Sequence, residues 1–448
     1  MDAHEYPAQA LRRRGRRTPV VEGADHAALD HAPGATNGRA GHTVNGAYAP
    51  DRVAPGSSAD ALARLAEEAR LARVQMVAWR DLEDPEAGGS EFHAHQVAAR
   101  WAAAGIEIEL RTSAVDGRSR FVRRSGYGVV RQSGRYGVFP HVAWHGLRTE
   151  TRPGEGLVEI WNGMPFFSPL WFRGPRIVFL HHVHAEMWGM TLPRWLARTG
   201  DTIERLLAPP LYRNSRIVTL SESSRREIVS MLGMRPSRIT VAPPGVGSRF
   251  TPDGERSPVP LVVAVGRLVP VKRFDMLIEA LARARVHRPD LRAVIIGEGY
   301  ERPRLEALRR HHGAEAWLEL PGRLDDDAMV DWYRKAWVVA SSSQREGWGM
   351  TLTEGGACGT PAVATRIAGH QDAVVDGKTG LLVDNRDELA GALLRVLGDP
   401  GLRRRLSAGA LRHARTFSWD ATAHHTLLAL TQEARGHEAQ ANGSRARA

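Results

Sequence analysis

Two glutamates that could hold a ligand rich in hydroxyls, Glu346 and Glu354, are separated by seven residues in the stretch QREGWGMTLTEGG. A carboxylate can accept hydrogen bonds from two hydroxyls, so it suits a vicinal diol. Gly347 and Gly349 lack a Cβ and would let the backbone approach a ligand closely. A helix is expected to begin near Met350, where free N–H groups and the helix dipole favour an anion such as a diphosphate. The spacing alone is weak evidence, because solvated surface glutamates show it too.

Two cations, Arg267 and Lys272, follow the apolar run LVVAVG and precede a predicted helix. Lysine occurs in this chain only at positions 272, 335 and 378. The start of a helix carries partial positive charge, so a bound anion explains a cation there better than a solvated surface does. Fixed cations stabilise the negative charge that develops on a leaving diphosphate. We therefore expect both side chains to act on a diphosphate, without an obligatory metal.

Predicted strands position these candidate residues. Beyond residue 260, apolar runs such as LVVAVG, LRAVIIG and WVVASS alternate with amphipathic runs, a pattern typical of a doubly wound α/β domain. An earlier series begins with VQMVAW at 74–79 and includes LVEIWN, RIVFLHH and RIVTLSE, which end in polar residues as buried parallel strands do at a crevice. Gly88 and Gly89 precede the first helix of that series. The sequence therefore predicts two α/β domains.

The length of 448 residues is too great for one core and fits two domains with tails. A stretch rich in proline and glycine, 242–260, is the expected boundary. Near the amino terminus only 59–73 has helical periodicity. The predicted division is a mostly disordered leader rich in Arg, Ala and Gly (1–70), a first domain (71–245), a second domain whose final helix can cross back to the first (246–432) and a disordered tail (433–448).

The formal net charge is +11, but the arginines are scattered apart from a cluster at 12–17. No aromatic residues interleave with that cluster, so we expect a solvated, Arg-biased surface rather than a nucleic-acid groove, with attraction to anionic lipid left open. The single cysteine, Cys358, excludes an internal disulfide and a cysteine-based zinc cage. No apolar run approaches about 18 residues, and the amino-terminal residues do not resemble a secretory signal. The expected location is the cytoplasm, either free or peripheral at the inner face of the membrane.

The later series of strands resembles the family 4 retaining glycosyltransferases of the GT-B architecture, or glycosyl transferases group 1, in VGRLVPVKRFDMLIEA, IIGEGYERPRLEAL and SSQREGWGMTLTEGGACGTPAVAT. The resemblance covers about residues 74–432 and is strongest at 262–383. It implies two Rossmann-like domains that face one another across a cleft. It also implies transfer of a hexose from a nucleotide-diphosphate sugar, such as a UDP- or GDP-hexose, to a hydroxyl of a glycan, glycolipid or small molecule. The leaving phosphate would act as the base, and no cofactor would be obligatory.

The resemblance also implies roles for individual residues. Glu346 would bind the hydroxyls of the donor sugar and Glu354 the ribose of the nucleotide. The catalytic group would be Arg267, Lys272, Glu346 and His182. The donor-binding group would be Gly88, Gly89, Gly266, Gly297, Arg323, Gly347, Gly349, Met350, Thr351 and Glu354. Two features depart from the family pattern and leave the acceptor side undefined: Gly247 stands where an Asp is common, and the loop DLEDPEAGGSE is long and acidic.

The histidine is chosen from three, His181, His182 and His184, which end a predicted strand in FLHHVHAEMW, where the family has a histidine in the cleft. Strand alternation places His182 and His184 on one side and His181 on the other. We expect His182 to face the cleft, although the sequence does not fix which of the three does so. Zinc binding is the alternative, but no further ligand recurs nearby at a suitable spacing. The acidic run 325–327 precedes AMVDWYRKA and is expected to cap that helix rather than to bind metal.

Three other functions stay open from the sequence: a sugar-nucleotide epimerase or phosphorylase of the same architecture, a non-catalytic sugar-nucleotide sensor, and a basic nucleic-acid-binding protein. The stretch 192–213 has helical apolar spacing and contains Trp195. Such spacing is typical of a packed helix and also of a helix that docks on lipid. The base and sugar of the donor and the identity of the acceptor are not predicted.

Overall fold

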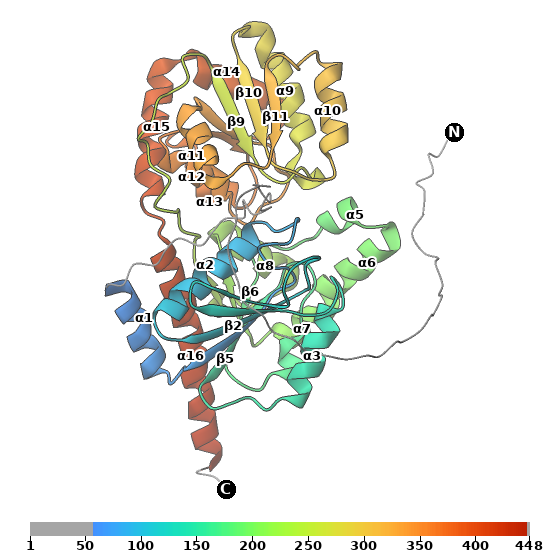
Figure 1. The fold of residues 1–448 in the computed structure, drawn as a ribbon, viewed down its shortest axis with the longest axis vertical. Helices are drawn as coiled ribbons and strands as arrows, with labels where there is room; N and C mark the ends of the chain where they lie inside the picture. Colours follow the sequence, from blue (N-terminus) through green and yellow to red (C-terminus); the bar gives the residue numbers. More distant parts are fainter. Residues whose placement is uncertain (1–56, 446–448) are drawn as a thin grey trace, which may run out of the picture. The chain divides into compact units, whose positions relative to one another are not determined.

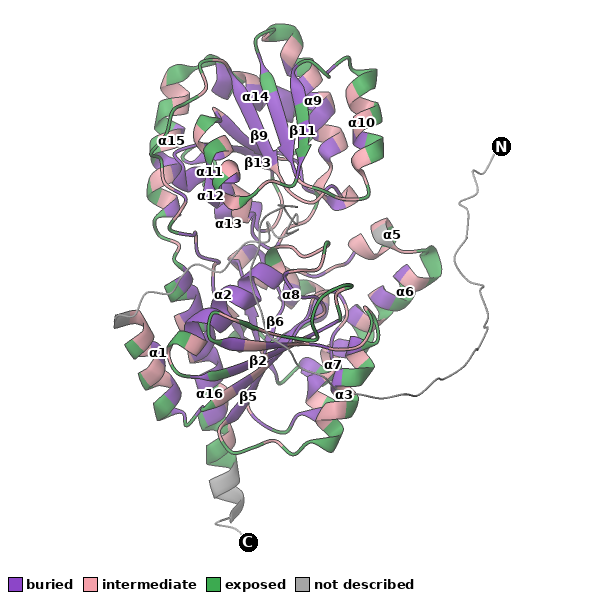
Figure 2. Ribbon diagram, viewed as in Figure 1, coloured by how far each residue is buried: buried purple, intermediate pink, exposed green. Residues whose placement is uncertain are grey.

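The computed structural model describes residues 57–445, which form two separate β-sheets covered by helices (Figure 1). The leader predicted for 1–70 therefore lies outside the described residues as far as residue 56. Most strands are buried, whereas the outer sides of the helices are exposed (Figure 2). Two α/β sheets confirm the predicted fold class.

The first sheet has eight strands in the order β3-β4-β2-β1-β5-β6-β7-β8. Neighbouring strands are parallel, except that β3 and β4 form an antiparallel pair at one edge. Every residue of β5 is buried, as expected for a strand that is covered on both faces. The strands are β1 (Arg73–Val77), β2 (Glu107–Thr112), β3 (Phe121–Arg124), β4 (Tyr127–Arg131), β5 (Glu155–Ile160), β6 (Arg176–Phe179), β7 (Arg216–Thr219) and β8 (Ile239–Val241).

Helices cover both faces of the first sheet. Val158 of β5 lies in one core and its neighbour Leu157 in another, because successive strand residues point to opposite faces. Trp101 of α2 fills the first of these cores, and its indole N–H donates to the carbonyl of Ala423 at 3.0 Å. The helices are α1 (Ser57–Glu68), α2 (Gly89–Ala103), α3 (Val138–Arg148), α4 (Ser168–Trp171), α5 (Met187–Thr191), α6 (Arg194–Thr202), the π-helical turn η1 (Ile203–Leu207), α7 (Ala208–Tyr212), α8 (Glu222–Leu232) and the 3-10 turn η2 (Pro236–Arg238).

Helix α1 lies inside the segment that was predicted to be mostly disordered. Leu62 and Ala66 are buried in the core of the first sheet. Arg435, near the end of the chain, donates a hydrogen bond to Glu68 at 2.7 Å. The helical periodicity of 59–73 thus corresponds to a real helix, but its assignment to the leader is wrong, because its apolar side is covered by the rest of the first domain.

The last helix, α16 (Trp419–Arg445), packs on the first sheet rather than the second. Leu427 and Leu430 belong to the core that contains β1 and β2. Glu433 forms ion pairs with Arg216 at 3.1 Å and with Arg238 at 3.0 Å. The disordered tail predicted from residue 433 is therefore wrong as far as 445, where the helix ends. The ion pairs of Glu433 and the buried Ala434 hold the beginning of this part of the helix against the first domain.

The second sheet has six strands in the order β11-β10-β9-β12-β13-β14, and every neighbouring pair is parallel. The strands are β9 (Leu261–Val265), β10 (Arg292–Ile296), β11 (Leu318–Gly322), β12 (Val338–Ser341), β13 (Ala362–Thr365) and β14 (Gly380–Val383). The helices are η3 (Pro270–Lys272), α9 (Phe274–His287), α10 (Arg302–His311), α11 (Asp326–Lys335), α12 (Met350–Ala357), α13 (His370–Ala373), α14 (Arg386–Gly398) and α15 (Pro400–Ala414).

Two local features of the second domain match their predictions. Asp325 caps α11, since its carboxylate accepts a hydrogen bond from the amide of Ala328 at 2.8 Å. Helix α12 begins at Met350 after Gly349, whose φ is +115°.

The strands of the second sheet are parallel, so the loops that follow β9, β10 and β12 meet at one edge of the sheet. The candidate residues of the second domain lie in these loops.

The two domains are joined by two neighbouring segments. Residues 242–260 contain neither helix nor strand and run past the start of α16. Thr422 of α16 donates to the carbonyl of Pro243 at 2.6 Å. A Cβ on Gly245 would lie 2.0 Å from the amide nitrogen of Trp419, so only glycine fits there without a shift.

Within residues 57–445, no helix is both long enough and apolar enough to cross a bilayer.

Candidate active site

Lys272 and Glu346 form an ion pair between the loops that follow β9 and β12. Ser343 donates a second hydrogen bond to the Oε1 atom of Glu346 at 2.8 Å. Ser342 donates to the carbonyls of Lys272 and Arg273, at 2.9 and 2.8 Å, and so fixes the lysine loop against the glutamate loop. Burial raises the pKa of Glu346, but the charge of Lys272 and the hydrogen bonds from Lys272 and Ser343 outweigh it and lower the pKa to about 2. Glu346 is therefore a fixed carboxylate that can accept hydrogen bonds from hydroxyls.

Arg267 lies against the glycine loop of the first domain. Its Nη1 atom donates to the carbonyl of Glu86 at 2.9 Å. A Cβ on Gly88 would lie 3.2 Å from the Nε atom of Arg267, and one on Gly89 would lie 2.9 Å from the Cε atom of Met350. The structure thus brings two residues of the first domain, Gly88 and Gly89, next to two residues of the second, Arg267 and Met350.

The glycines after β9 and β10 let two loops pack directly on each other. A Cβ on Gly297 would lie 1.9 Å from the carbonyl oxygen of Gly266, and the φ of Gly297 is +147°. The amide of Leu268 donates to the carbonyl of Glu298 at 2.8 Å. Both predicted glycines therefore shape the backbone that carries Arg267.

The glycines between the two predicted glutamates are also held by close contacts. A Cβ on Gly347 would lie 2.5 Å from the carbonyl oxygen of His181 in the first domain. A Cβ on Gly349 would lie 2.9 Å from the Cδ2 atom of His370. Thr351 is half-buried in the first turn of α12. The start of α12 thus lies beside both the glutamate loop and the histidine segment after β6.

The three histidines after β6 have different surroundings. The Nε2 atom of His181 lies 3.2 Å from the Nδ1 atom of His93, whereas His182 and His184 stack with ring centroids 5.0 Å apart. Burial lowers the pKa of His182 to about 4; the carboxylate of Glu346 opposes this shift, and the nearby cations add to it. His182 therefore lies near the Lys272–Glu346 pair and is neutral at pH 7. Within residues 57–445, no three His, Cys, Asp or Glu side chains are grouped so that they could hold a metal ion.

Two further predicted donor-binding residues, Glu354 and Arg323, have different surroundings from the residues described above. Glu354 is buried on α12, and the hydroxyl of Tyr333 donates to its Oε2 atom at 3.0 Å. A ribose would have to compete with this tyrosine for that oxygen. Arg323 is exposed immediately after β11.

Several residues that bridge the two domains were not predicted. The Nε atom of Arg345 donates to the carbonyl of Val183 at 2.6 Å. The carboxylate of Asp372 accepts from the amides of Glu222 and Ser223, at 3.1 and 3.3 Å, at the start of α8. Arg345 directly precedes Glu346, so its place in the sequence could have marked it as a residue of the site. Asp372 carries no such signal, because its partners lie in another domain.

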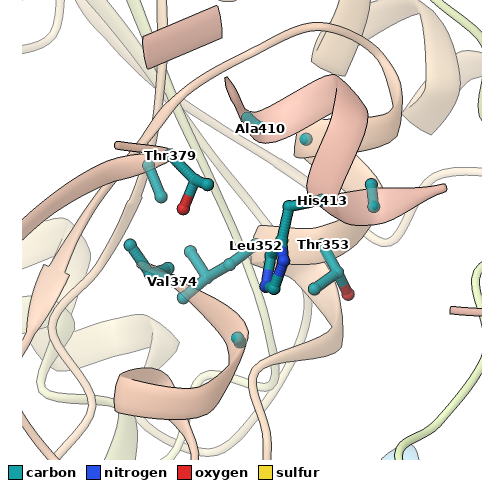
Figure 3. A pocket seen from close by; sticks show the side chains of 10 residues that line it. Leu352, Thr353, Val374, Thr379, Ala410 and His413 are labelled. Atoms are coloured by element: carbon teal, nitrogen blue, oxygen red, sulfur yellow. The ribbon is translucent and has the colours of Figure 1, made fainter. Parts of the chain in front are cut away.

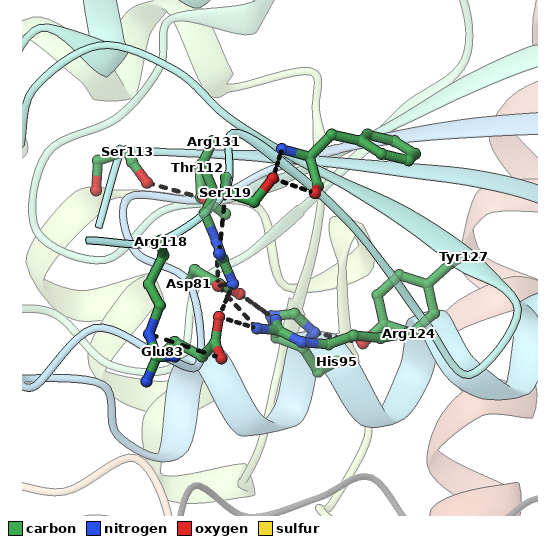
Figure 4. Close-up of polar contacts among 11 residues, drawn as sticks. Asp81, Glu83, His95, Thr112, Ser113, Arg118, Ser119, Arg124, Tyr127 and Arg131 are labelled. Carbon is green, nitrogen blue, oxygen red and sulfur yellow. Dashed lines mark hydrogen bonds and ion pairs between the residues drawn. The ribbon is translucent and has the colours of Figure 1, made fainter. Parts of the chain in front are cut away.

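A second set of unpredicted residues anchors the loop that leads to Gly88 (Figure 4). Asp81 is completely buried and accepts hydrogen bonds from Arg124 Nη2 at 3.0 Å and Arg131 Nε at 2.7 Å. The Nε2 atom of His95 lies 3.3 Å from the same carboxylate. Burial raises the pKa of Asp81, but hydrogen bonds from His95 and Arg124 hold it far below its usual range. Buried charges therefore hold the loop that contains Asp81 against Arg124 of β3 and Arg131 of β4.

Two cavities of the second domain lie away from the Lys272–Glu346 pair. One, behind α12, has a volume of about 10 Å³, roughly the space of one water, and its lining includes Leu352, Thr353, Val374, Thr379, Ala410 and His413 (Figure 3). The other has a volume of about 240 Å³ and includes Leu261 and Arg292, which begin β9 and β10. It therefore lies at the opposite edge of the sheet from the loops that carry Arg267 and Glu346.

Comparison with known proteins gives a family for each half of the chain. The model described as Glycosyltransferase Family 4 matches residues 87–249, and the one described as Glycosyl transferases group 1 matches residues 250–413. A protein of Acidothermus cellulolyticus named D-inositol 3-phosphate glycosyltransferase is 31% identical over 403 residues, which are 78% of this chain and 88% of that protein. A protein of the same name from Kribbella flavida is 34% identical over 235 residues, and that match spans 48% of this chain and 55% of the relative.

Solved structures share the fold at lower sequence identity. Sucrose-phosphate synthase from Thermosynechococcus elongatus has a TM-score of 0.65 and 20% identity, and the match covers 78% of this chain and 96% of that one. Anabaena HepE in complex with UDP-glucose has a TM-score of 0.60 and 16% identity, with coverage of 82% and 99%. The predicted family is confirmed: the chain belongs to the family 4, group 1 glycosyltransferases and has the GT-B architecture of two Rossmann-like domains.

Proposed function

We propose that this glycosyltransferase moves a hexose from a nucleotide-diphosphate sugar to an acceptor hydroxyl with retention of configuration. The observation that carries the proposal is the half-buried Lys272–Glu346 ion pair, which lies with Arg267 in the loops after β9 and β12. A charged carboxylate suits the hydroxyls of a sugar, and two cations suit a diphosphate. These are the two parts of a nucleotide-sugar donor.

In the proposed reaction, Arg267 and Lys272 stabilise the negative charge that develops on the diphosphate as the glycosidic bond breaks. The free amides at the start of α12, at Met350 and Thr351, add hydrogen bonds to the phosphates. Glu346 holds the hydroxyls of the transferred sugar. The leaving phosphate takes the proton of the acceptor hydroxyl, so the protein supplies no general base.

His182 is proposed to contact the transferred sugar on the side of the first domain. Its low pKa keeps the ring neutral, so one ring nitrogen can donate a hydrogen bond and the other can accept one. The Nε2 atom is buried and has no hydrogen-bond partner within residues 57–445. A hydroxyl of the donor sugar would satisfy that atom.

The relatives suggest which substrates to test first. HepE was crystallised with UDP-glucose, and the Acidothermus and Kribbella proteins are named for D-inositol 3-phosphate. We therefore propose a UDP-hexose as the first donor, a GDP-hexose as the second, and a phosphorylated polyol as the first acceptor. The proposed site would serve an acceptor in solution or at a lipid surface.

The test measures thermal stabilisation by UDP, GDP and their sugars, and then sugar transfer, with the wild type and Lys272→Ala. Chelator is present throughout, because the proposal requires no metal. A stabilising nucleotide whose effect is lost in Lys272→Ala, together with transfer that retains the anomeric configuration by NMR, is the expected result. Lys378→Ala is the matched control, since Lys378 is exposed and lies outside the proposed site. Binding of the nucleotide sugar without transfer to any acceptor would overturn the proposal in favour of a sensor.

A further inference from the structure

Exposed apolar side chains gather on one group of helices in the first domain. Twelve large apolar residues are exposed within residues 57–445, and seven of them lie on α3, α4, α6, η1 and α7. Trp195 is 69% exposed and Leu206 is 68% exposed. Exposed apolar groups of this size are expected singly on a soluble surface, whereas a cluster marks an interaction site. The seven are Trp144, Leu147, Leu170, Trp195, Leu206, Leu207 and Leu211.

These helices form a connected set, which we call the apolar–basic face. Helix α3 contacts α4, α4 contacts α7, α7 contacts η1 and η1 contacts α6. Figure 2 shows exposed residues along α3 and α6. The buried sides of α6 and α7 face the rest of the domain and consist of Ala197, Gly200, Ala208 and Tyr212. The tryptophan and leucines are therefore left on the outer side by the packing itself.

The charges on the apolar–basic face are mainly positive. Its helices carry four arginines: Arg148, Arg194, Arg198 and Arg205. They contain two acidic residues, Asp201 and Glu204. Asp201 is partly exposed and lies 3.8 Å from Arg205, whereas Glu204 is buried. The guanidinium of Arg148 lies 3.8 Å above the ring of Trp144. The exposed side chains of the apolar–basic face are therefore arginines interspersed with Trp and Leu.

We propose that the apolar–basic face binds an anionic lipid bilayer. Trp and Leu side chains insert at the boundary between headgroups and acyl chains, and arginines attract anionic headgroups. A second copy of this chain fits the face less well, because a two-fold contact would bring the arginines of both copies together. Charge thus favours an anionic surface over self-association.

The apolar–basic face is connected to the proposed active site through Glu204. The buried carboxylate accepts hydrogen bonds from the amides of His184 and Ala185, at 2.8 and 3.1 Å, and from the indole of Trp188 at 3.0 Å. His184 stacks on His182. A bilayer held on this face would therefore lie on the helices that position the histidine loop. An acceptor at the lipid surface would then approach the enzyme from the first domain.

The test is sedimentation of the full chain with vesicles. The vesicles contain equal parts of phosphatidylglycerol and phosphatidylcholine, or phosphatidylcholine alone. We expect binding to the anionic vesicles, weakened by salt. The variant Trp195→Ser/Leu206→Ser/Leu207→Ser should lose at least tenfold in affinity, because three inserting side chains are removed. The variant Arg194→Gln/Arg198→Gln should lose about fivefold per arginine on the anionic vesicles.

Matched controls separate this surface from general effects. Phe121→Ser/Val286→Ser removes two exposed apolar side chains outside the apolar–basic face and should bind vesicles like the wild type. All variants should keep the melting temperature of the wild type, since the altered side chains are exposed. Absence of binding to anionic vesicles, or equal binding by the Trp195 variant and the wild type, would overturn the proposal. A dimer in the wild type that the same variant abolishes would show that a second copy covers this face instead.

Discussion

The two domains hold their parts of the proposed site in different ways. In the second domain, Lys272 and Glu346 are fixed by each other and by Ser342 and Ser343, all in loops that follow adjacent strands. In the first domain, the loop that carries Gly88 is fixed by Asp81, which is bound to arginines from the β3–β4 hairpin. The comparison teaches that the same edge of a parallel sheet can be organised by neighbouring loops or by buried charges from a distant hairpin.

The largest expected effect comes from removing the charge of Asp81. Asp81→Asn leaves Arg124 and Arg131 without their buried carboxylate, and breaking a buried ion pair costs about 3–5 kcal/mol. Chemical denaturation should show this loss of stability. Glu279→Gln in the second domain removes a partner of Arg386 in a more exposed pair and should cost at most about 1 kcal/mol. Equal losses in the two variants would contradict the contrast between the domains.

Lys272→Ala should have the next largest effect, and on turnover rather than on folding. Loss of one group that stabilises charge in the transition state lowers turnover by about 10² to 10³ fold. The measurement is the rate of nucleotide release in the presence of an acceptor, with Lys378→Ala as the control. Wild-type turnover in Lys272→Ala would show that the loops of the second domain do not carry the chemistry.

Gly88→Ala tests the contact between the two halves of the site. The new Cβ would lie 3.2 Å from the Nε atom of Arg267, so the arginine must move by a few tenths of an ångström. We expect turnover to fall by about tenfold, less than the roughly 10² fold that a 1 Å misplacement can cost. Gly134→Ala is the matched control, because a Cβ there meets no atom within 4 Å. If both alanines lowered turnover alike, the close approach of Gly88 to Arg267 would not matter for the reaction.

The pH dependence of stability should change as well. The pKa of Glu346 is lowered from 4.5 to about 2, because the charge of Lys272 and hydrogen bonds outweigh the effect of burial. A carboxylate with a lowered pKa in the folded state stabilises the protein fully above its unfolded pKa, and this stabilisation is lost as the pH falls toward the folded pKa. The difference in unfolding free energy between the wild type and Lys272→Ala should therefore shrink between pH 4.5 and pH 2. A difference that stays constant over this range would exclude Lys272 as the cause.

Much of the fold could be predicted because its signals are local. Apolar runs of strand length, the cap at Asp325 and the start of α12 at Met350 each depend on a few consecutive residues. Helix α1 was underestimated, and α16 was ended too early, because the partners that bury them lie at opposite ends of the chain. The interdomain contacts of Arg345 and Asp372 were missed for the same reason.

The sequence by itself determined that Arg267, Lys272 and Glu346 follow strands of one parallel sheet, since strand alternation places such loops at a common edge. Only the tertiary structure decided that Lys272 pairs with Glu346, that His181 turns to His93 while His182 lies near the pair, and that Gly88 meets Arg267. The physical reason is that hydrogen bonds and ion pairs act over a few ångströms. Which side chains come that close depends on how elements distant in the sequence pack together.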